Sequence, residues 1–222
     1  LARILGAQTN EIVFTSSATE SNNLALKGVV RAYREHGNHI VISAIEHACV
    51  LEAARALERE GCALTIVPVD RSGRLTADAI AKAIRPDTVL VSVMHANNEI
   101  GTIEPIHEIA AAIKKFRGSH PSRLHSPLST LHLPLLHTDA VQTFGRLPAN
   151  VRELGVDLLT CSSHKIYGPK GAALLYIRDG VRIEPLLHGG GHEDGRRSST
   201  VNVPAIVGFA EAAELAERVR ER

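Results

Sequence analysis

Three short polar segments carry residue types that could do chemistry together. Lys165 lies in residues 162–171 (SSHKIYGPKG), after a predicted strand and before a Gly-Pro turn. A lysine at the exit of a strand, near an anion site, can act as a Schiff-base nucleophile. The alternative is a solvated surface lysine, which is the common case for any single lysine.

The second segment, residues 15–23 (TSSATESNN), joins a predicted strand to a helix. Ser17 and Glu20 form a capping box, so the helix should begin there. The free N–H groups and the dipole of a helix N-terminus attract anions, and the hydroxyls of Ser17 and Thr19 could add donors. A plain helix cap is the alternative.

The third segment, residues 137–142 (HTDAVQ), places Asp139 at the end of a short apolar strand. A carboxylate there could hold a protonated heterocycle nitrogen, or it could simply cap a turn. Taken together, a phosphate cradle, a Schiff-base lysine and a carboxylate for a ring nitrogen are the three requirements of pyridoxal 5'-phosphate. The combination therefore favours that cofactor over three unrelated surface features.

The surrounding sequence alternates between short apolar runs and amphipathic stretches, which predicts strands and helices in turn. Strands are expected at residues 11–15, 39–43, 63–67, 88–94, 135–138, 157–161 and 172–177. Helices are expected from the capping box to Gly37, and at 47–60, 76–84, 106–116 and 204–222. This order implies βαβ units, and thus an α/β fold with a mostly parallel sheet between helices. Ligands bind beyond the carboxyl ends of such strands, where all three polar segments lie.

Composition limits the possible classes of protein. The chain has 222 residues, 44% of them hydrophobic and 22% charged, with a formal net charge of +1. This near-neutral balance gives no indication of nucleic-acid or membrane-surface binding. No apolar run approaches the roughly 18 residues of a membrane helix. Three cysteines, Cys49, Cys62 and Cys161, are too few for a disulfide scaffold and indicate a reducing compartment.

Residues 118–134 (GSHPSRLHSPLSTLHLP) break the pattern and have no strand or helix period. Four histidines in or near this stretch suggest a metal loop as one possibility: His120, His125, His132 and His137. Their spacing fits no usual ligand motif, so a surface insertion without metal is expected instead. Gly189–Gly191 lacks the spacing of a dinucleotide-binding loop, so that function is rejected.

Six segments carry a resemblance to a known family, in order and at the family's spacing: FTSSATESNNLALKG, EHACVLEAA, MHANNEIGTIEPI, HTDAVQTFG, SSHKIYGPKG and GGGHEDGRRSSTVNVP. With them, the chain resembles the cysteine desulfurases of the class V aminotransferase group, which are fold-type-I pyridoxal-phosphate enzymes. The resemblance runs from about Asn10 to the C-terminus and is interrupted only by residues 118–134. It implies the large domain of a PLP-dependent transferase.

The resemblance also implies a role for each matching residue. Lys165 would bond the cofactor aldehyde, Asp139 would pair with the pyridine nitrogen, and His47 would stack on the ring and help move protons. Gln142 would hydrogen-bond the ring hydroxyl, and Asn98 would lie near the ring and the substrate carboxylate. The phosphate would be bound by Ala18, Thr19, Ser162 and His164. Thr200 would reach the phosphate of a partner subunit, which implies a homodimer.

The chain departs from the family in its thiols and at its ends. The family's catalytic cysteine lies far downstream of the Schiff-base lysine, but no cysteine follows Lys165 here, and Cys49, Cys62 and Cys161 do not match it. The arginine for the substrate carboxylate and the N-terminal arm are also missing, and Ser199 stands where the family has glycine. We therefore expect a chain truncated at both ends. Residues 1–203 should form the cofactor-binding large domain, and residues 204–222 a helix leading toward a small domain.

The full-length parent is expected to be a cysteine desulfurase. Such an enzyme converts L-cysteine to L-alanine and an enzyme persulfide, for a sulfur-acceptor or scaffold protein in iron–sulfur cluster or thio-cofactor assembly. Selenocysteine lyase and other class V aminotransferases are the alternatives on the same scaffold. An alternative of another kind is a non-catalytic module that binds cofactor or dimerises. The expected location is cytoplasmic, or mitochondrial in a eukaryote.

Overall fold

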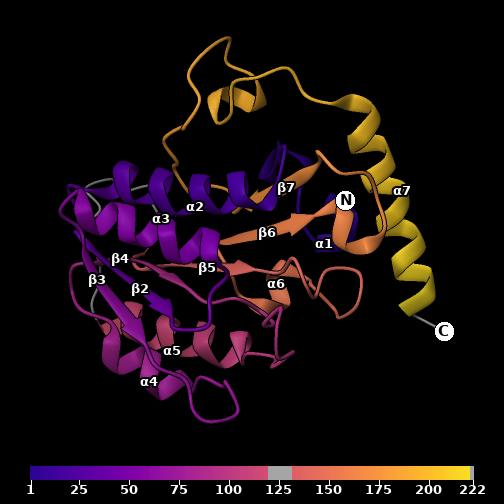
Figure 1. Ribbon diagram of the computed structural model, residues 1–222. Helices are drawn as coiled ribbons and strands as arrows, with labels where there is room; N and C mark the ends of the chain where they lie inside the picture. The colour runs from indigo at the N-terminus through magenta and orange to yellow at the C-terminus, as the bar shows by residue number, and fades with distance from the viewer. Residues whose placement is uncertain (120–131, 221–222) are drawn as a thin grey trace.

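The computed structural model describes residues 1–119 and 132–220 (Figure 1). Within these residues the chain forms one seven-stranded sheet in the order β1-β7-β6-β5-β4-β2-β3. The strands are β1 (Ile12–Thr15), β2 (His39–Ser43), β3 (Ala63–Val67), β4 (Thr88–Ser92), β5 (Leu135–Asp139), β6 (Leu158–Ser162) and β7 (Ala173–Ile177). Neighbouring strands from β3 to β6 pair in parallel, whereas β7 runs antiparallel to both β1 and β6. The predicted mostly parallel α/β sheet is confirmed.

Helices cover both faces of this sheet (Figure 1). One face packs against α2 (Ala18–Tyr33) and α3 (Ala48–Arg59), and the other against α4 (Ala77–Ala83), α5 (Ile106–Ser119) and α6 (Val151–Leu154). Successive strand residues point to opposite faces, so Ile40 and Ile42 join the core under α2 and α3, while Val41 joins the other core. Every residue of β4 is buried, as expected for a strand whose sequence does not alternate between polar and apolar residues.

The predicted start of α2 after Ser17 is confirmed, but only half of the predicted capping box forms. Ser17 Oγ accepts a hydrogen bond from the Glu20 backbone N–H at 3.2 Å, as a helix cap does. The Glu20 carboxylate instead reaches the backbone N–H of Ser16, at 2.8 Å. The helix ends at Tyr33, four residues before Gly37, where the sequence predicted its end.

Most other predicted elements differ from the structure by one to three residues at one or both ends. The sixth strand is Leu158–Ser162, one residue later than predicted. Asp157 precedes it because its buried side chain is an ion-pair partner of two arginines and accepts the Leu136 backbone N–H. The short helices α1 (Ala2–Leu5) and α6 were not predicted, since each has only four residues and too little length for a periodic pattern.

The predicted insertion at residues 118–134 falls largely on 120–131, so it and the histidines His120 and His125 lie outside the described residues. Its edges belong to the fold, which corrects the prediction. Residues 118 and 119 end α5, and Leu133 is buried. His137 lies inside β5, bonded to Ser92 and Thr160. No group of potential metal ligands occurs among the described residues.

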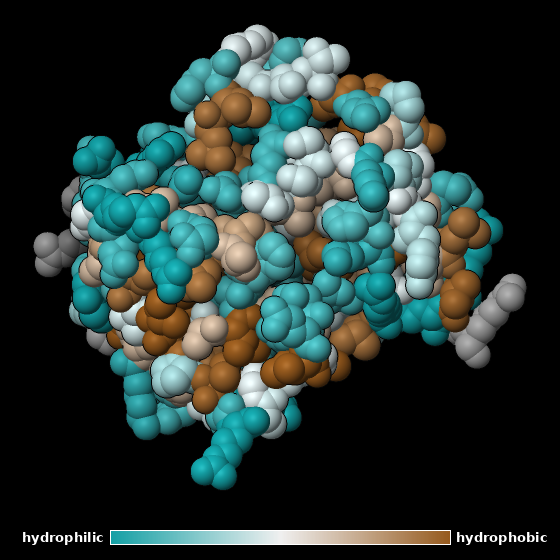
Figure 2. Space-filling view, in the orientation of Figure 1, coloured by the Kyte–Doolittle hydropathy of each residue, from teal (hydrophilic) through white to brown (hydrophobic). Residues whose placement is uncertain are grey.

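The last helix, α7 (Val203–Arg220), packs against the end of the sheet near the turn after β6 (Figure 1). Its buried side chains are Ala205, Phe209 and Ala213, and the Phe209 ring lies edge-on to Phe144 with the centroids 5.9 Å apart. Leu215 and Val219 stay exposed, and Figure 2 shows apolar side chains at the surface near the C-terminal end of this helix. No described helix is long and apolar enough to cross a membrane. The division into residues 1–203 and 204–222 stays a prediction.

Candidate functional site

The carboxyl ends of the parallel strands surround a cavity of about 240 Å³. Its walls come from the turns after β1, β2, β4, β5 and β6, as expected for a parallel sheet. Eight of the ten predicted site residues line it: Ala18, Thr19, His47, Asn98, Asp139, Gln142, His164 and Lys165. Ser17, Cys49, Met94 and Val141 complete the lining.

Two predicted residues do not line the cavity. Ser162 is buried behind it, and its hydroxyl lies 2.9 Å from Nδ1 of His164, which does line it. Thr200 is exposed and belongs to the long connection between β7 and α7. Its expected contact is with a partner subunit, so its role stays a prediction.

Lys165 lies in a single 3₁₀ turn, residues Ser163–Ile166, that directly follows β6. Tyr167 ends this turn with a φ of 64°, a left-handed conformation that turns the chain away from the strand. The backbone oxygen of Lys165 accepts a hydrogen bond from Arg146 at 2.6 Å. Strand β6 and this bond together hold the lysine at the cavity wall.

The Asp139 carboxylate is almost fully buried at the end of β5. Its Oδ1 accepts the Val141 backbone N–H at 2.9 Å, and its Oδ2 accepts Nδ2 of Asn22 at 2.7 Å. Burial raises the pKa of Asp139, while these two hydrogen bonds and the nearby His47 act in the opposite direction. Each oxygen thus has one protein donor and keeps a free lone pair, which suits a cationic N–H in the cavity.

His47 caps the N-terminus of α3 with its own ring. Nδ1 accepts the Cys49 backbone N–H at 3.2 Å and lies 2.9 Å from the Cys49 sulfur. A neutral ring that accepts at Nδ1 carries its proton on Nε2. In the contact between Nδ1 of His47 and the Cys49 sulfur, the S–H group is then the donor. Burial raises the pKa of Cys49, so the thiol keeps the proton that it donates.

Asn22 and Cys49 are site residues that sequence reasoning missed. Cys49 was weighed only as the family's catalytic cysteine, although it stands two residues after His47 in the first turn of the same predicted helix. Asn22 falls within the TSSATESNN segment, but its bond to Asp139 spans 117 residues of sequence. No local pattern predicts such a contact.

The N-terminus of α2 forms one end of the cavity. Ala18 and Thr19 occupy its first turn, where backbone N–H groups have no acceptor within the helix. His164 lines the same cavity; burial, followed by the charges of Lys165 and Lys170, lowers its pKa. Neutral at ordinary pH, its imidazole can donate one hydrogen bond without adding charge.

Two further polar residues beside the cavity have structural partners. His95 is buried, and its Nδ1 lies 2.9 Å from the Thr143 hydroxyl. Glu46 accepts hydrogen bonds from Ser43 and from the Met94 backbone through Oε1, while its Oε2 has no hydrogen-bond partner among the described residues. Burial raises the pKa of Glu46 to about 8.

These groups fit pyridoxal phosphate. A lysine amine, a buried carboxylate with free lone pairs, an imidazole and a helix N-terminus face one small cavity. They match an aldehyde, a ring nitrogen, a ring face and a phosphate in turn. The cavity volume is below the roughly 300–1,000 Å³ of drug-sized ligand sites, which suits a compact cofactor.

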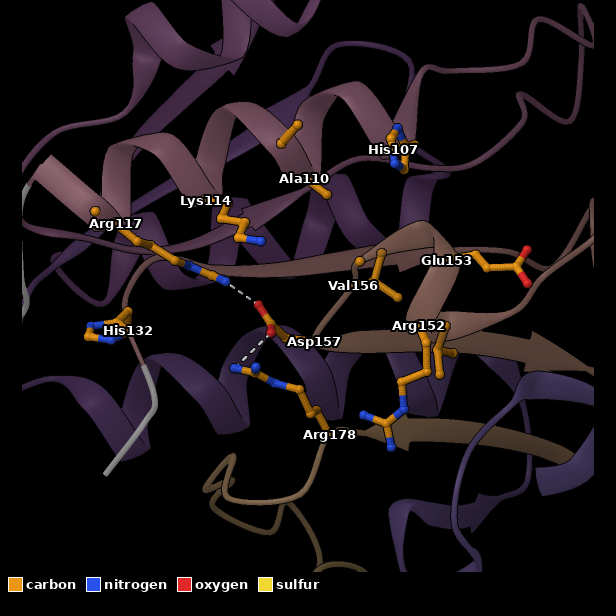
Figure 3. Close-up of a pocket in the computed structure, with 14 residues that line it drawn as sticks. His107, Ala110, Lys114, Arg117, His132, Arg152, Glu153, Val156, Asp157 and Arg178 are labelled. Atoms are coloured by element: carbon orange, nitrogen blue, oxygen red, sulfur yellow. Dashed lines mark hydrogen bonds and ion pairs between the residues drawn. The ribbon is translucent and has the colours of Figure 1, made fainter. Parts of the chain in front are cut away.

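A larger cavity of about 800 Å³ lies at the other edge of the sheet, between α5, α6 and the start of β6 (Figure 3). Asp157 forms ion pairs there with both Arg117 and Arg178, as Figure 3 shows. None of the predicted site residues lines it. The two arginines tie α5 and the end of β7 to β6, which is a structural role.

Comparison with known proteins gives concordant matches. The family model described as Aminotransferase class-V matches residues 1–221. The cysteine desulfurase IscS of Dictyoglomus turgidum is 50% identical over 216 residues, which cover 97% of this chain and 51% of that protein. The mitochondrial cysteine desulfurase of Saccharomyces cerevisiae is 47% identical, covering 98% of this chain and 41% of that protein.

Solved structures agree with this result. A NifS-like protein superposes with a TM-score of 0.89 at 42% identity, covering 99% of this chain and 56% of its own. A structure described as SspA in complex with cysteine gives a TM-score of 0.85 at 41% identity, over 96% of this chain and 57% of its own. The chain thus spans about half the length of the relatives it matches.

Proposed function

Because this chain belongs to the class-V aminotransferase family, we propose that it is the cofactor-binding part of a cysteine desulfurase that works with pyridoxal 5'-phosphate. The observation that carries the proposal is the single cavity shared by Lys165, Asp139 and His47. The names of its relatives, which are cysteine desulfurases, support the same activity.

Each residue has a definite task in this proposal. When bound, pyridoxal phosphate supplies an electron-poor ring that stabilises negative charge developing on an amino-acid substrate. The Lys165 amine, which faces the cavity, would hold the cofactor at its aldehyde group. Asp139 keeps the ring nitrogen protonated, because its buried carboxylate has a free lone pair for that N–H.

The remaining residues bind and orient. Nε2 of His47, which carries the proton in the neutral ring, is free of the helix cap and can donate or return a proton beside the ring face. Ala18, Thr19 and His164 hold the phosphate, together with Ser162, whose hydroxyl lies behind His164 in this structure. Gln142 holds the ring hydroxyl, and Asn98 lies near the ring and the substrate carboxylate. Thr200 contributes to the partner's site in a homodimer.

The substrate in this proposal is L-cysteine, and the products are L-alanine and a persulfide for a sulfur-acceptor or scaffold protein. The catalytic thiol is not among the three cysteines of this sequence. Cys62 and Cys161 are buried outside the cavity, and Cys49 lines it but is held protonated. We propose a cytoplasmic location, or a mitochondrial one in a eukaryote.

An absorbance titration tests the cofactor assignment. Pyridoxal phosphate added to the purified chain should give a band near the visible edge that is lost in Lys165→Ala. Lys170→Ala is the matched control, since it removes a nearby lysine that does not line the cavity. A band that persists in Lys165→Ala, or no band in the unaltered chain, would contradict the assignment.

A further inference from the structure

Asn22 is a fully buried polar side chain directly behind the candidate cofactor cavity. It lies in α2, one turn after Ala18 and Thr19, and has no solvent-exposed surface. Its Nδ2 bonds Oδ2 of Asp139 at 2.7 Å and the sulfur of Cys49 at 3.2 Å. Its Oδ1 has no hydrogen-bond partner among the described residues.

The orientation of this amide follows from the chemistry of its neighbours. An ionised carboxylate can only accept hydrogen bonds, so the NH₂ group, and not the oxygen, must face Asp139. One of the two N–H bonds points to the carboxylate and the other to the sulfur. Leaving Oδ1 unpaired in a buried place costs free energy, and the two bonds from Nδ2 offset that cost.

The first bond fixes the plane of the Asp139 carboxylate. The Val141 N–H holds Oδ1 and Asn22 holds Oδ2, so neither oxygen can rotate without losing a bond. The remaining lone pairs of the carboxylate therefore keep a fixed direction. A cationic N–H in the cavity meets a carboxylate that is already oriented, and such preorganisation strengthens binding.

The second bond reaches His47 through the thiol of Cys49. Because the sulfur accepts from Asn22, its own S–H is available for Nδ1 of His47, 2.9 Å away. That bond, together with the Cys49 backbone N–H, keeps the proton of the neutral ring on Nε2. The same amide thus acts on the groups expected at the ring nitrogen and at the ring face.

We propose that Asn22 is a positioning residue of this site, whose buried amide orients the Asp139 carboxylate directly and the His47 ring through the Cys49 thiol. The proposal rests on the proposed function, since it assigns Asn22 to the residues that would hold pyridoxal phosphate. It adds a residue that does not line the cavity.

Other titratable groups act on Asp139 and must be kept constant in a test. His47 favours its charged form, whereas Glu46, Cys49 and Cys161 lie close enough for their charged forms to interact with it unfavourably. Asn22 is uncharged, so replacing it removes a donor without changing the charge of the site. The titration of Asp139 then reports the lost hydrogen bond.

The experiment compares Asn22→Ala with Asn23→Ala, the adjacent asparagine of the same helix, whose amide bonds the Thr19 backbone oxygen. Carbon-13 NMR of the cofactor-free chain follows the Asp139 carboxyl. We expect the Asp139 carboxyl of Asn22→Ala to titrate about one pH unit higher than that of the unaltered chain. The variant should also bind pyridoxal phosphate about tenfold more weakly. Asn23→Ala should match the unaltered chain in both. Equal values for the two variants would overturn the proposal.

The branch through the thiol has its own test. Cys49→Ala should leave the Asp139 titration unchanged but increase the share of His47 that carries its proton on Nδ1, as measured by nitrogen-15 NMR. Cys49→Ser keeps an O–H donor and should restore the unaltered tautomer. An unchanged tautomer in Cys49→Ala, or no rescue by serine, would remove this branch and overturn the proposal as stated.

A measurement on the unaltered chain needs no variant to fold. Both side-chain N–H protons of Asn22 should exchange slowly with water and shift when Asp139 titrates, unlike those of Asn23. Exchange as fast as in Asn23 would contradict the proposal. These readouts do not need the cofactor, so a chain that binds no pyridoxal phosphate would contradict the proposed function while the role of Asn22 is still decided.

Discussion

Nε of Arg197 lies 2.7 Å from Oε1 of Glu20, and this ion pair joins the turn before Thr200 to the first turn of α2. Both side chains are largely buried. Glu20 also accepts the backbone N–H and the hydroxyl of Ser16. The pair therefore connects the helix end expected to hold phosphate with the segment expected to reach a partner's phosphate.

Arg197→Ala should weaken that connection. Loss of a largely buried, charged hydrogen bond should lower the free energy of unfolding by about 1–3 kcal/mol and reduce pyridoxal phosphate affinity several-fold. Arg3→Ala is the matched control, since it breaks a well-exposed pair with Glu214 that should contribute less than about 1 kcal/mol. Urea unfolding and the absorbance titration measure both effects. Equal losses in the two variants would contradict the prediction.

The same pair predicts a pH dependence. Burial alone would raise the pKa of Glu20, but the bonds from Arg197 and Ser16 outweigh it and lower the pKa below 4.5. The unfolded chain then binds the proton more tightly than the folded one, so this stabilisation is present above pH 4.5 and is lost as the pH falls through the lowered pKa. Glu20→Gln should show less loss of stability over that acidic range. If Glu20→Gln lost as much stability as the unaltered chain over that range, the prediction would be wrong.

The buried Glu46 carboxyl should make the free energy of unfolding depend on pH in the opposite sense, at higher pH. Its pKa rises from 4.5 to about 8 on folding because the carboxyl is buried, so the folded chain binds a proton more tightly. Stability should fall as the pH rises from 4.5 to about 8. Glu46→Gln, which replaces the protonated carboxyl by a neutral amide, should flatten this decline, whereas the exposed Glu58→Gln should not. Urea unfolding at several pH values measures the free energy of unfolding. A decline with pH that is as steep in Glu46→Gln as in the unaltered chain would contradict this prediction.

Asp157→Asn should separate stability from cofactor binding. It removes the charge shared by Arg117 and Arg178 at the far edge of the sheet (Figure 3), and breaking one side of a buried ion pair costs about 3 kcal/mol. The free energy of unfolding should fall by that amount, while the folded chain should bind pyridoxal phosphate as before. Affinity that falls in parallel with stability would show that the two edges are coupled.

These 222 residues should release no sulfide from L-cysteine above the rate of Lys165→Ala. The physical reason is that the one thiol lining the cavity, Cys49, is kept protonated by burial, and a thiolate is the reactive form. A sulfide assay with a reductant measures this directly. Release above the control would mean that a cysteine of this sequence can accept sulfur.

Local patterns in the sequence predicted most of the elements. The strands at 39–43 and 63–67 have their predicted bounds, and Ser17 and Thr76 cap the predicted helices. These features depend on hydrogen bonds and apolar spacing within a few residues, so they can be recognised in one segment at a time. Short helices such as α6 and the ends of α2 and β6 depend on packing and on buried ion pairs, and were missed or shifted.

The sequence by itself determined which residue types would meet at the carboxyl ends of the strands, because parallel pairing brings those ends to one edge of the sheet. Only the tertiary structure decided how they meet. It set the strand order, joined eight of the predicted residues in one cavity, and left Ser162 and Thr200 outside it. It also brought Asn22 to Asp139 and Cys49 to His47. Such contacts arise from the packing of α2 and α3 on the sheet, a non-local property that no short pattern encodes.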